Sequence, residues 1–313
     1  MIGKTELNSM AQPTLRQLAA LVAIADTGLF KSAAEKLHVS QPALSEQISQ
    51  LEYRLGALLL ERDRRGARLT PVGAEVASRA RVILQQVTEL GDVVRSGLAN
   101  LGGLIRLGAL PALGPYLMPH IVPVLHARYP ELRLYVREAW AARLEEGVLT
   151  GVHDCALTVG PVQASGLHAE FLFEEDLLLG IAREDELAAR DAIPARALGG
   201  RNMLTLEDGH RLTEDAKAIA HAGGAVLLDD YQGTSLDGLR QMVGMGMGVS
   251  VFPRFYERSE IRNDQAVVAR PLKMAGARRP ICLIWREASP RAEDFAALGR
   301  IIGEKAVALM AED

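Results

Sequence analysis

The 313-residue sequence has few aromatic residues, 4% of the total, and only two cysteines. Two cysteines cannot form the disulfide framework of a small secreted domain, and they fit a reducing compartment. Apolar runs are short as well, because Arg, Glu or Asp interrupts each one before it could span a bilayer. The first residues show no signal-peptide pattern. We therefore expect a cytoplasmic protein, associated with the nucleoid if it binds DNA, with no membrane contact.

Catalytic motifs are also missing. The sequence has no glycine-framed nucleophilic serine, no P-loop and no closely spaced His and Glu set that could bind a metal. A glycine run at 244–248 resembles a nucleotide-binding loop, yet it follows a predicted helix and precedes a predicted strand, the reverse of the order that phosphate binding needs. The end of a helix explains this run better. We expect no enzyme, no catalytic residue, no cofactor and no metal.

Residues 32–45 have the pattern of two helices joined by a tight turn. The first helix has a narrow apolar face that a second helix can cross closely. Three residues form this face: Ala33, Ala34 and Leu37. Ser40 is a good N-cap for the second helix, and Pro42 falls in its first turn, where no backbone donor is needed. The pattern predicts a helix-turn-helix that binds DNA.

The second helix has a polar side that could contact bases. An apolar stripe of Leu44, Ile48 and Leu51 leaves the polar side chains, Glu46 among them, on the other faces. Recognition helices present their first half to the major groove, where Gln can pair with adenine, so Gln41 and Ser45 are the best base-contacting candidates. The DNA-binding set from this segment is Ser40, Gln41, Pro42, Ser45, Gln47 and Ser49. A purely structural helical hairpin is the alternative.

An arginine-rich segment follows at 61–70, with four arginines around Gly66. It has the pattern of a winged hairpin that lies along phosphates or enters the minor groove, where arginine is favoured. Its DNA-binding candidates are Arg62, Arg64, Arg65 and Arg68. They would contribute to affinity more than to specificity. A solvated surface is the alternative explanation for such a charge run.

A long helix is predicted from Pro71 to about residue 100, where several glycines end it. Its apolar residues recur at spacings of 4, 3, 4, 3 and 4, which is a heptad pattern. They are Val76, Ala80, Ile83, Val87, Leu90 and Val94. Such a seam favours a homodimer through this helix. Packing against its own domain is the alternative.

These segments together resemble the LysR-type transcriptional regulators over essentially the whole chain. The residues that carry the resemblance are Leu18, Phe30, Ala33, Ala34, Leu37, Ser40, Gln41, Pro42, Ala43, Leu44, Ser45, Ile48, Leu51, Glu52, Leu55, Gly56, Leu60, Arg62, Thr70 and Gly73. The resemblance implies binding to double-stranded operator DNA, a homodimer that assembles into a homotetramer, a small-molecule effector, and contact with RNA polymerase where the protein activates transcription. It also implies a two-lobed effector domain like that of periplasmic binding proteins.

The last two thirds of the chain alternate predicted strands and helices, which is typical of a parallel sheet covered by helices. A chain that leaves one lobe and returns to it makes two lobes with a hinge. The expected fold is therefore α+β and multidomain. Its parts are a winged helix-turn-helix at 13–70, a linker helix at 71–100, a first lobe at 104–173, a second lobe at 174–273 and a segment returning to the first lobe at 274–304.

Within the family the chain is most similar to the peroxide-sensing OxyR type, through residues 114–121, 206–210 and 234–236. The resemblance also shows a departure. The reactive and resolving cysteines of that type are replaced here by Arg211 and Ala220, and two threonines beside the reactive thiol by Ala112 and Ala141. Thiol sensing of peroxide at this position is therefore not expected.

The two cysteines present, Cys155 and Cys282, lie in apolar runs typical of strands in a core. A redox regulator that uses either of them is an alternative.

Ligands bind at the carboxyl ends of strands in such folds, and three predicted turns meet there. They contain Ala112, Leu113 and Gly114, then His210 and Arg211, and then Thr234 and Ser235 before a helix. Because Arg211 offers a fork of donors, we hypothesise a small anionic effector held by Arg211, Thr234 and Ser235. Pairing of Arg211 with Glu207, Asp208 or Glu214 is one alternative, and constitutive or partner-controlled regulation is another.

Overall fold

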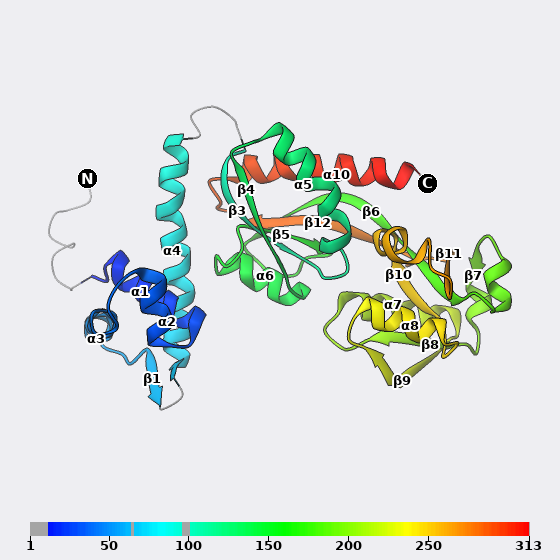
Figure 1. Ribbon diagram of the computed structural model, residues 1–313, viewed down its shortest axis with the longest axis horizontal. Coiled ribbons are helices and arrows are strands. Elements are labelled where there is room, and N and C mark those ends of the chain that lie inside the picture. Colours follow the sequence, from blue (N-terminus) through cyan, green and yellow to red (C-terminus); the bar gives the residue numbers. More distant parts are fainter. Residues whose placement is uncertain (1–11, 64–65, 96–100, 313) are drawn as a thin grey trace. The chain divides into compact units, whose positions relative to one another are not determined.

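The computed structural model (Figure 1) describes residues 12–63, 66–95 and 101–312, without the side chains at 62, 63, 66, 88–95, 229 and 231. The chain divides into two compact units. The N-terminal unit comprises residues 1–97 with 150–152, and the C-terminal unit comprises residues 98–149 with 153–313.

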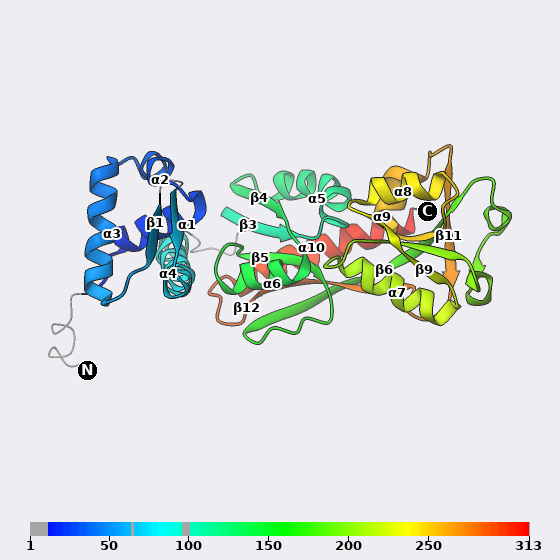
Figure 2. The same cartoon turned by 90° about the horizontal axis from the view of Figure 1, so that it is seen from below.

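The N-terminal unit consists of helices around a small core, with a hairpin. Its elements are α1 (Leu15–Thr27), α2 (Phe30–Leu37), α3 (Gln41–Leu55), β1 (Leu60–Asp63), β2 (Gly66–Leu69) and α4 (Pro71–Arg95). Figure 2 shows α3 along one side of this unit, with α1, α2 and the hairpin on its other side.

The expected helix-turn-helix is confirmed in detail. His38 ends α2 in the left-handed conformation, with φ 56°, and turns the chain toward α3. The Ser40 hydroxyl accepts a hydrogen bond from the Ala43 N–H at 3.3 Å, and Pro42 lies in the first turn of α3. The apolar stripe of α3 is buried in the core of the unit: Leu44, Ile48 and Leu51. One side of α3 is thereby fixed against α1 and α2, and the other faces outward.

The expected winged hairpin is confirmed in its backbone. Strands β1 and β2 pair antiparallel, with Leu60 opposite Leu69. The Glu52 carboxylate of α3 accepts from the N–H groups of Leu59 and Leu60, at 2.8 and 3.1 Å, which ties the start of the hairpin to α3.

Helix α4 uses its apolar residues in two ways. Ala80 is buried and Val76 half-buried in the core of the N-terminal unit, as the self-packing alternative expects. Farther along, Ile83 and Val87 are 42% and 40% exposed. The side chains of Leu90 and Val94 lie outside the described residues. The described part of the seam therefore leaves two apolar side chains partly exposed to solvent.

The C-terminal unit begins with a mixed sheet that forms its first lobe (Figure 1). The strand order is β4 (Leu132–Glu138), β3 (Gly103–Ala109), β5 (Cys155–Val159), β12 (Arg278–Arg286) and β6 (Leu167–Ala182). The helices of this lobe are α5 (Gly114–Arg128), α6 (Ala141–Leu149) and α10 (Ala292–Ala311). Side chains from the sheet and these helices share one core, which includes Ile105, Leu157 and Leu283.

Strand β6 continues into a second lobe. There it pairs with β10 (Ser250–Pro253) and β11 (Val267–Lys273), and β11 pairs with β7 (Ile193–Pro194). A parallel pair lies beside them, β8 (Asn202–Leu206) and β9 (Val226–Gly233), with helices α7 (Arg211–Gly223) and α8 (Leu236–Gly244). The short helical segments are η1 (Glu186–Ala189), η2 (Ala195–Leu198), α9 (Arg254–Tyr256) and η3 (Glu257–Ile261). This lobe has a second, separate core.

The structure corrects the expectation of a parallel sheet. Strand β3 is parallel to β4 and β5, but β12 is antiparallel to both β5 and β6. Apolar runs locate strands and do not fix their direction, which here depends on how the long β6 crosses between the lobes. The expected boundary at 173 and 174 falls inside β6.

Candidate DNA-binding and effector sites

The DNA-contacting candidates of the helix-turn-helix extend from the N-cap of α3 to its middle. Ser40, Gln41, Pro42 and Ser49 are exposed, and Ser45 and Gln47 are half-buried. All of them lie on sides of the helix that the buried stripe leaves available. A helix N-terminus with small and amide side chains on its outer face has the dimensions and hydrogen-bonding groups that the major groove accepts.

The arginine candidates of the hairpin are only partly described. Arg68 on β2 is exposed. Arg64 and Arg65 lie outside the described residues, as does the side chain of Arg62. The backbone pairing of the hairpin places Arg62 opposite Ala67 and Glu61 opposite Arg68.

Arg211 connects the two lobes of the C-terminal unit. It is the first residue of α7, and its Nη2 donates a hydrogen bond to the main-chain oxygen of Gly160, just after β5, at 3.3 Å. Its Nε is buried and has no hydrogen-bond partner among the described residues. Within the described part of the chain Arg211 forms no ion pair; Asp208, one of its proposed partners, instead pairs with Lys217 at 2.8 Å. The surface-pairing alternative is therefore not observed.

One turn farther along α7 lies Asp215, whose carboxylate is a hydrogen-bond acceptor, whereas the Arg211 guanidinium is a donor. The Asp215 Oδ2 is buried and, like the Arg211 Nε, has no hydrogen-bond partner in the part of the chain that the structure describes. Burial raises the pKa of this carboxyl, and the positive charges of Arg279 and Arg211 oppose that rise. A donor and an acceptor are thus left unsatisfied on the same helix, which is costly unless a ligand or water completes them.

A buried ion pair lies beside this region. The guanidinium of Arg279 donates from Nε and Nη2 to Glu175 Oε2, at 2.9 and 2.7 Å. Arg279 Nη2 also reaches the Ala112 oxygen at 3.4 Å, and the Phe255 N–H donates to Glu175 Oε1 at 3.2 Å. Sequence reasoning missed both charges, because each lies in a run of charged residues that looks like exposed strand surface.

Trp140 of the first lobe covers the loop before Arg211. Its ring lies 5.2 Å from that of His210, centroid to centroid. A Cβ at Gly209, where φ is +99°, would come within 2.9 Å of the indole, so only glycine fits beneath it. Burial lowers the pKa of His210, although Glu207 opposes this, and the neutral imidazole is favoured. Trp140 and His210 therefore form a second contact between the lobes.

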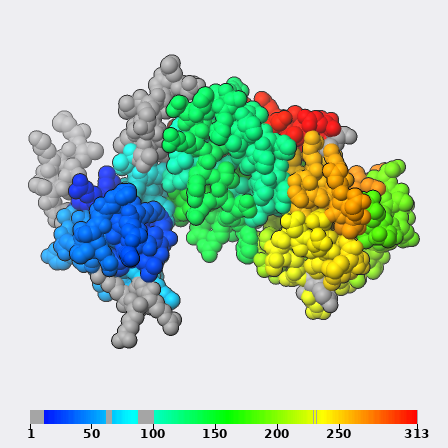
Figure 3. All heavy atoms as spheres, viewed as in Figure 1, coloured from blue at the N-terminus to red at the C-terminus, as the bar shows by residue number. Residues whose placement is uncertain are grey.

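The other effector candidates are arranged less favourably. Leu113 is fully buried in the first-lobe core, and the N–H groups of Leu113 and Gly114 both donate to the Leu110 oxygen. Thr234 and Ser235 are exposed at the start of α8, whose yellow surface faces the viewer in Figure 3. The Ser235 hydroxyl accepts from the Gly238 N–H at 3.1 Å. Among the described residues Arg211 forms no hydrogen bond with Thr234 or Ser235.

The two cysteines occupy the core, as the sequence indicates. Cys155 is 0% and Cys282 8% exposed, and neither forms a disulfide. Burial raises the pKa of both thiols, which opposes formation of the reactive thiolate. In the ladder Cys282 is opposite Thr158, three residues from Cys155. With about 3.3 Å per residue along the strand and about 5 Å between strands, the two Cα atoms are roughly 11 Å apart, beyond the reach of a disulfide.

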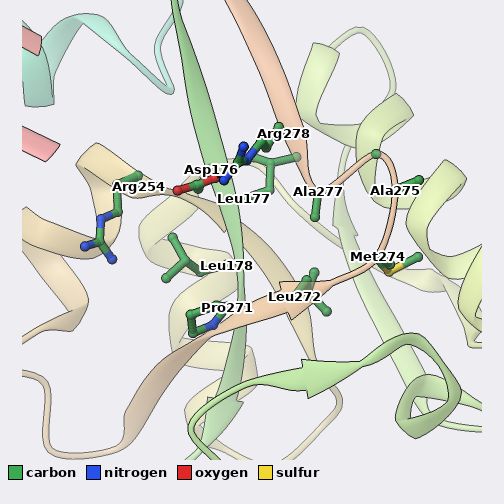
Figure 4. Close-up of a pocket in the computed structure, with 11 residues that line it drawn as sticks. Asp176, Leu177, Leu178, Arg254, Pro271, Leu272, Met274, Ala275, Ala277 and Arg278 are labelled. Atoms are coloured by element: carbon green, nitrogen blue, oxygen red, sulfur yellow. Dashed lines mark hydrogen bonds and ion pairs between the residues drawn. The ribbon is translucent and has the colours of Figure 1, made fainter. Parts of the chain in front are cut away.

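A surface hollow of about 540 Å³ lies elsewhere, between β6, β11 and the turn to β12 (Figure 4). Asp176 and Arg278 pair across its rim at 2.7 Å, and Met274, Leu272 and Arg254 line it. Another of about 550 Å³ lies between β6 and α10. Neither is lined by an effector candidate from the sequence. The described residues contain no cluster suited to a metal ion, and none of their helices is long and apolar enough to cross a membrane.

Comparison with known proteins identifies both units. Residues 15–74 match the bacterial regulatory helix-turn-helix protein of the lysR family, and residues 99–306 match the LysR substrate binding domain. The chain is 35% identical to the DNA-binding transcriptional dual regulator OxyR of Escherichia coli K12 over 288 residues, covering 92% of this chain and 94% of that protein. It is 36% identical to a probable hydrogen peroxide-inducible genes activator of Streptomyces viridosporus, covering 94% of each.

Solved structures of OxyR proteins are also similar to this chain. A full-length OxyR of Pseudomonas aeruginosa with a cysteine-to-aspartate substitution superposes with a TM-score of 0.78 at 30% identity, covering 93% of this chain and 98% of that one. A hydrogen-peroxide-bound cysteine-to-serine variant of Corynebacterium glutamicum OxyR gives a TM-score of 0.65 at 29% identity, covering 96% and 98%. With both units matched in order, this chain belongs to the LysR family of DNA-binding transcriptional regulators.

Proposed function

We propose that this LysR-family regulator is controlled by a small ligand that binds beside Arg211, and that it does not depend on oxidation of a thiol. The observation that carries the proposal is the Arg211 side chain, which reaches from α7 to the Gly160 oxygen of the other lobe while its buried Nε has no partner. A ligand that accepts a hydrogen bond from Nε would act at a joint between the lobes. Its binding energy could then shift their relative arrangement.

The chemistry of the site favours a small polar ligand that offers an acceptor, as a carboxylate or phosphate does. The unpartnered Asp215 Oδ2 nearby would take a donor from the same ligand. Thiol chemistry has less support, since Cys155 and Cys282 are buried with raised pKa values and too far apart to bridge. The relatives named hydrogen peroxide-inducible activators make peroxide itself a ligand to include in any test.

We further infer that the protein acts in the cytoplasm as a homodimer through α4, and as a homotetramer on operator DNA, with RNA polymerase as partner where it activates. The exposed Ile83 and Val87 on α4 support self-association. Base contacts are assigned to Gln41 and Ser45, with Ser40, Pro42, Gln47 and Ser49 beside them. Phosphate contacts are assigned to Arg62, Arg64, Arg65 and Arg68.

The effector proposal is tested by a thermal-shift screen of the full chain against small organic acids, inorganic phosphate and hydrogen peroxide, since a ligand that binds the native state raises its melting temperature. Arg211→Ala is screened in parallel, with Arg190→Ala as the matched control, because Arg190 is exposed and in the same lobe. We expect a stabilising ligand for wild type and Arg190→Ala but not for Arg211→Ala. Equal stabilisation of all three proteins would contradict the proposal by placing the ligand at another site. Stabilisation of none of them would also contradict it and would favour constitutive or partner-controlled regulation.

A further inference from the structure

The recognition helix carries an exposed carboxylate that the structure holds in place. Glu46 of α3 lies one residue after Ser45 and four after Pro42. At 100° per residue it points roughly 160° away from Ile48, which is at the centre of the buried stripe. Glu46 is therefore on the outermost line of the helix, next to Pro42 and Ser49 of the DNA-binding set.

A chain of hydrogen bonds runs to Glu46 from the interior of the N-terminal unit. The Thr14 N–H donates to Gln17 Oε1 at 3.0 Å, as part of the cap of α1. Gln17 Nε2 donates to Gln50 Oε1 at 3.3 Å, and Gln50 Nε2 donates to Glu46 Oε1 at 2.7 Å. Gln17 is 1% exposed, so the chain begins from a fixed, buried amide.

The polarity of this chain has only one solution. A backbone N–H can only donate, so the Gln17 oxygen must accept and its nitrogen must donate onward. The orientation of the Gln50 amide follows in the same way. Its oxygen accepts from Gln17, so its nitrogen must donate and needs an acceptor at position 46. A carboxylate satisfies that need and keeps a second oxygen available. Gln50 has both ends of its amide engaged, so it acts as a positioning residue and not as a base contact.

We propose that Glu46 is a specificity-determining residue that accepts a hydrogen bond from the N4 amino group of a cytosine in the major groove, with Gln17 and Gln50 holding it in position. The proposal rests on the DNA-binding role of α3. In the major groove cytosine presents an amino donor, whereas guanine and thymine present acceptors that repel a carboxylate, and adenine places an acceptor beside its amino group. A carboxylate held near the DNA phosphates is unfavourable unless it accepts a hydrogen bond from such a donor. Glu46 should therefore lower the affinity for sites with other bases more than it raises the affinity for sites with cytosine.

The test is selection of bound sequences from random double-stranded DNA by the full chain, comparing wild type with Glu46→Ala, Glu46→Gln and Gln50→Ala. Glu35→Ala is the control, since Glu35 is an exposed carboxylate on the neighbouring helix α2. For wild type we expect one position of each half-site to favour cytosine over guanine or thymine by roughly 5- to 100-fold.

Each variant has its own expected result. Glu46→Ala loses that single preference and binds unselected DNA more tightly, and Glu46→Gln changes the preferred base to adenine, which Gln can pair with at two points. Gln50→Ala weakens the cytosine preference while the other positions and the melting temperature stay as in wild type, a result that a merely structural role would not give.

Two outcomes would overturn the inference. A sequence motif that is the same for wild type and both Glu46 variants would remove Glu46 from base recognition. A motif that changes with Glu46 but not with Gln50→Ala would remove the positioning role. Failure of wild type to select any motif would instead contradict the DNA-binding assignment of α3.

Discussion

Arg279 and Glu175 form a buried ion pair at 2.7 Å, with side chains that are 1% and 0% exposed. They face each other on β12 and β6, where these strands pass between the lobes. Through the Ala112 oxygen and the Phe255 N–H the pair also holds the loop before α5 and the start of α9. Four segments of the C-terminal unit therefore meet at one pair of charges.

Breaking this pair should be costly, because the remaining charge would be buried without its partner. We expect Arg279→Met to lower the free energy of unfolding by about 3–5 kcal/mol. The double variant Arg279→Met with Glu175→Met should lose less than the single one, since no charge stays uncompensated. Urea unfolding followed by fluorescence measures both. A single variant within about 1 kcal/mol of wild type would show that the pair contributes little.

The two classes of DNA contact should respond differently to substitution. Gln41→Ala should relax the preference at one base pair, at a cost of about 1–3 kcal/mol for the preferred site. Arg68→Ala should weaken binding to all sequences and reduce the slope of log affinity against log salt by about 1; the same holds for Arg64→Ala. Fluorescence anisotropy over a salt series separates the two effects. An unchanged binding-site motif for Gln41→Ala would show that the base-contacting face is wrongly assigned.

Self-association through α4 makes a prediction about one exposed valine. A charge placed in an apolar seam between helices must be desolvated on association, so Val87→Glu should shift the protein to monomer at micromolar concentration. Val72→Glu is the control, because Val72 is also exposed on α4 but lies outside the heptad positions. Light scattering coupled to size exclusion gives the masses. A dimer that survives Val87→Glu would place the interface elsewhere.

The pH dependence of stability should follow a buried histidine. Burial lowers the pKa of His153 from 6.5, helped by Arg137 and Arg106 and opposed by Asp154. Near and below pH 6.5 the unfolded chain therefore binds more protons than the folded chain. The contribution of His153 to the free energy of unfolding is at its maximum above about pH 6.5 and falls as the pH decreases. His153→Asn should flatten this fall, whereas His221→Asn, at an exposed site, should not. Urea midpoints measured from pH 5 to 8 that are parallel for His153→Asn and wild type would refute the assignment.

The sequence predicted the N-terminal unit well because the features of this unit depend on residues that are close together in the chain. The Ser40 cap, Pro42 and the stripe of Leu44, Ile48 and Leu51 each depend on residues within a few turns, and the structure confirms them. The alternation of strands and helices expected along the C-terminal unit is also present. Periodicity measures burial along one segment, and these segments are buried on defined faces.

The remaining features depend on distant residues. The antiparallel course of β12 and the length of β6 follow from pairing between segments about a hundred residues apart, which no local pattern contains. The Arg279–Glu175 pair and the contact of Trp140 with His210 are of the same kind. Leu113 and Gly114 looked available to a ligand, but their N–H groups already serve the turn. Arg211 was expected in a turn and is the first residue of α7, and its Gly160 partner could not be foreseen.

The central claim is that a ligand at Arg211 controls operator binding without a thiol. The most direct measurement is the affinity of the full chain for its selected operator, with and without the stabilising ligand from the thermal-shift screen, for wild type, Arg211→Ala and the Cys155→Ala, Cys282→Ala double variant. We predict a ligand-dependent change in Kd for wild type and the cysteine-free protein, and none for Arg211→Ala. A response that persists in Arg211→Ala, or that disappears with the two cysteines, would contradict the account.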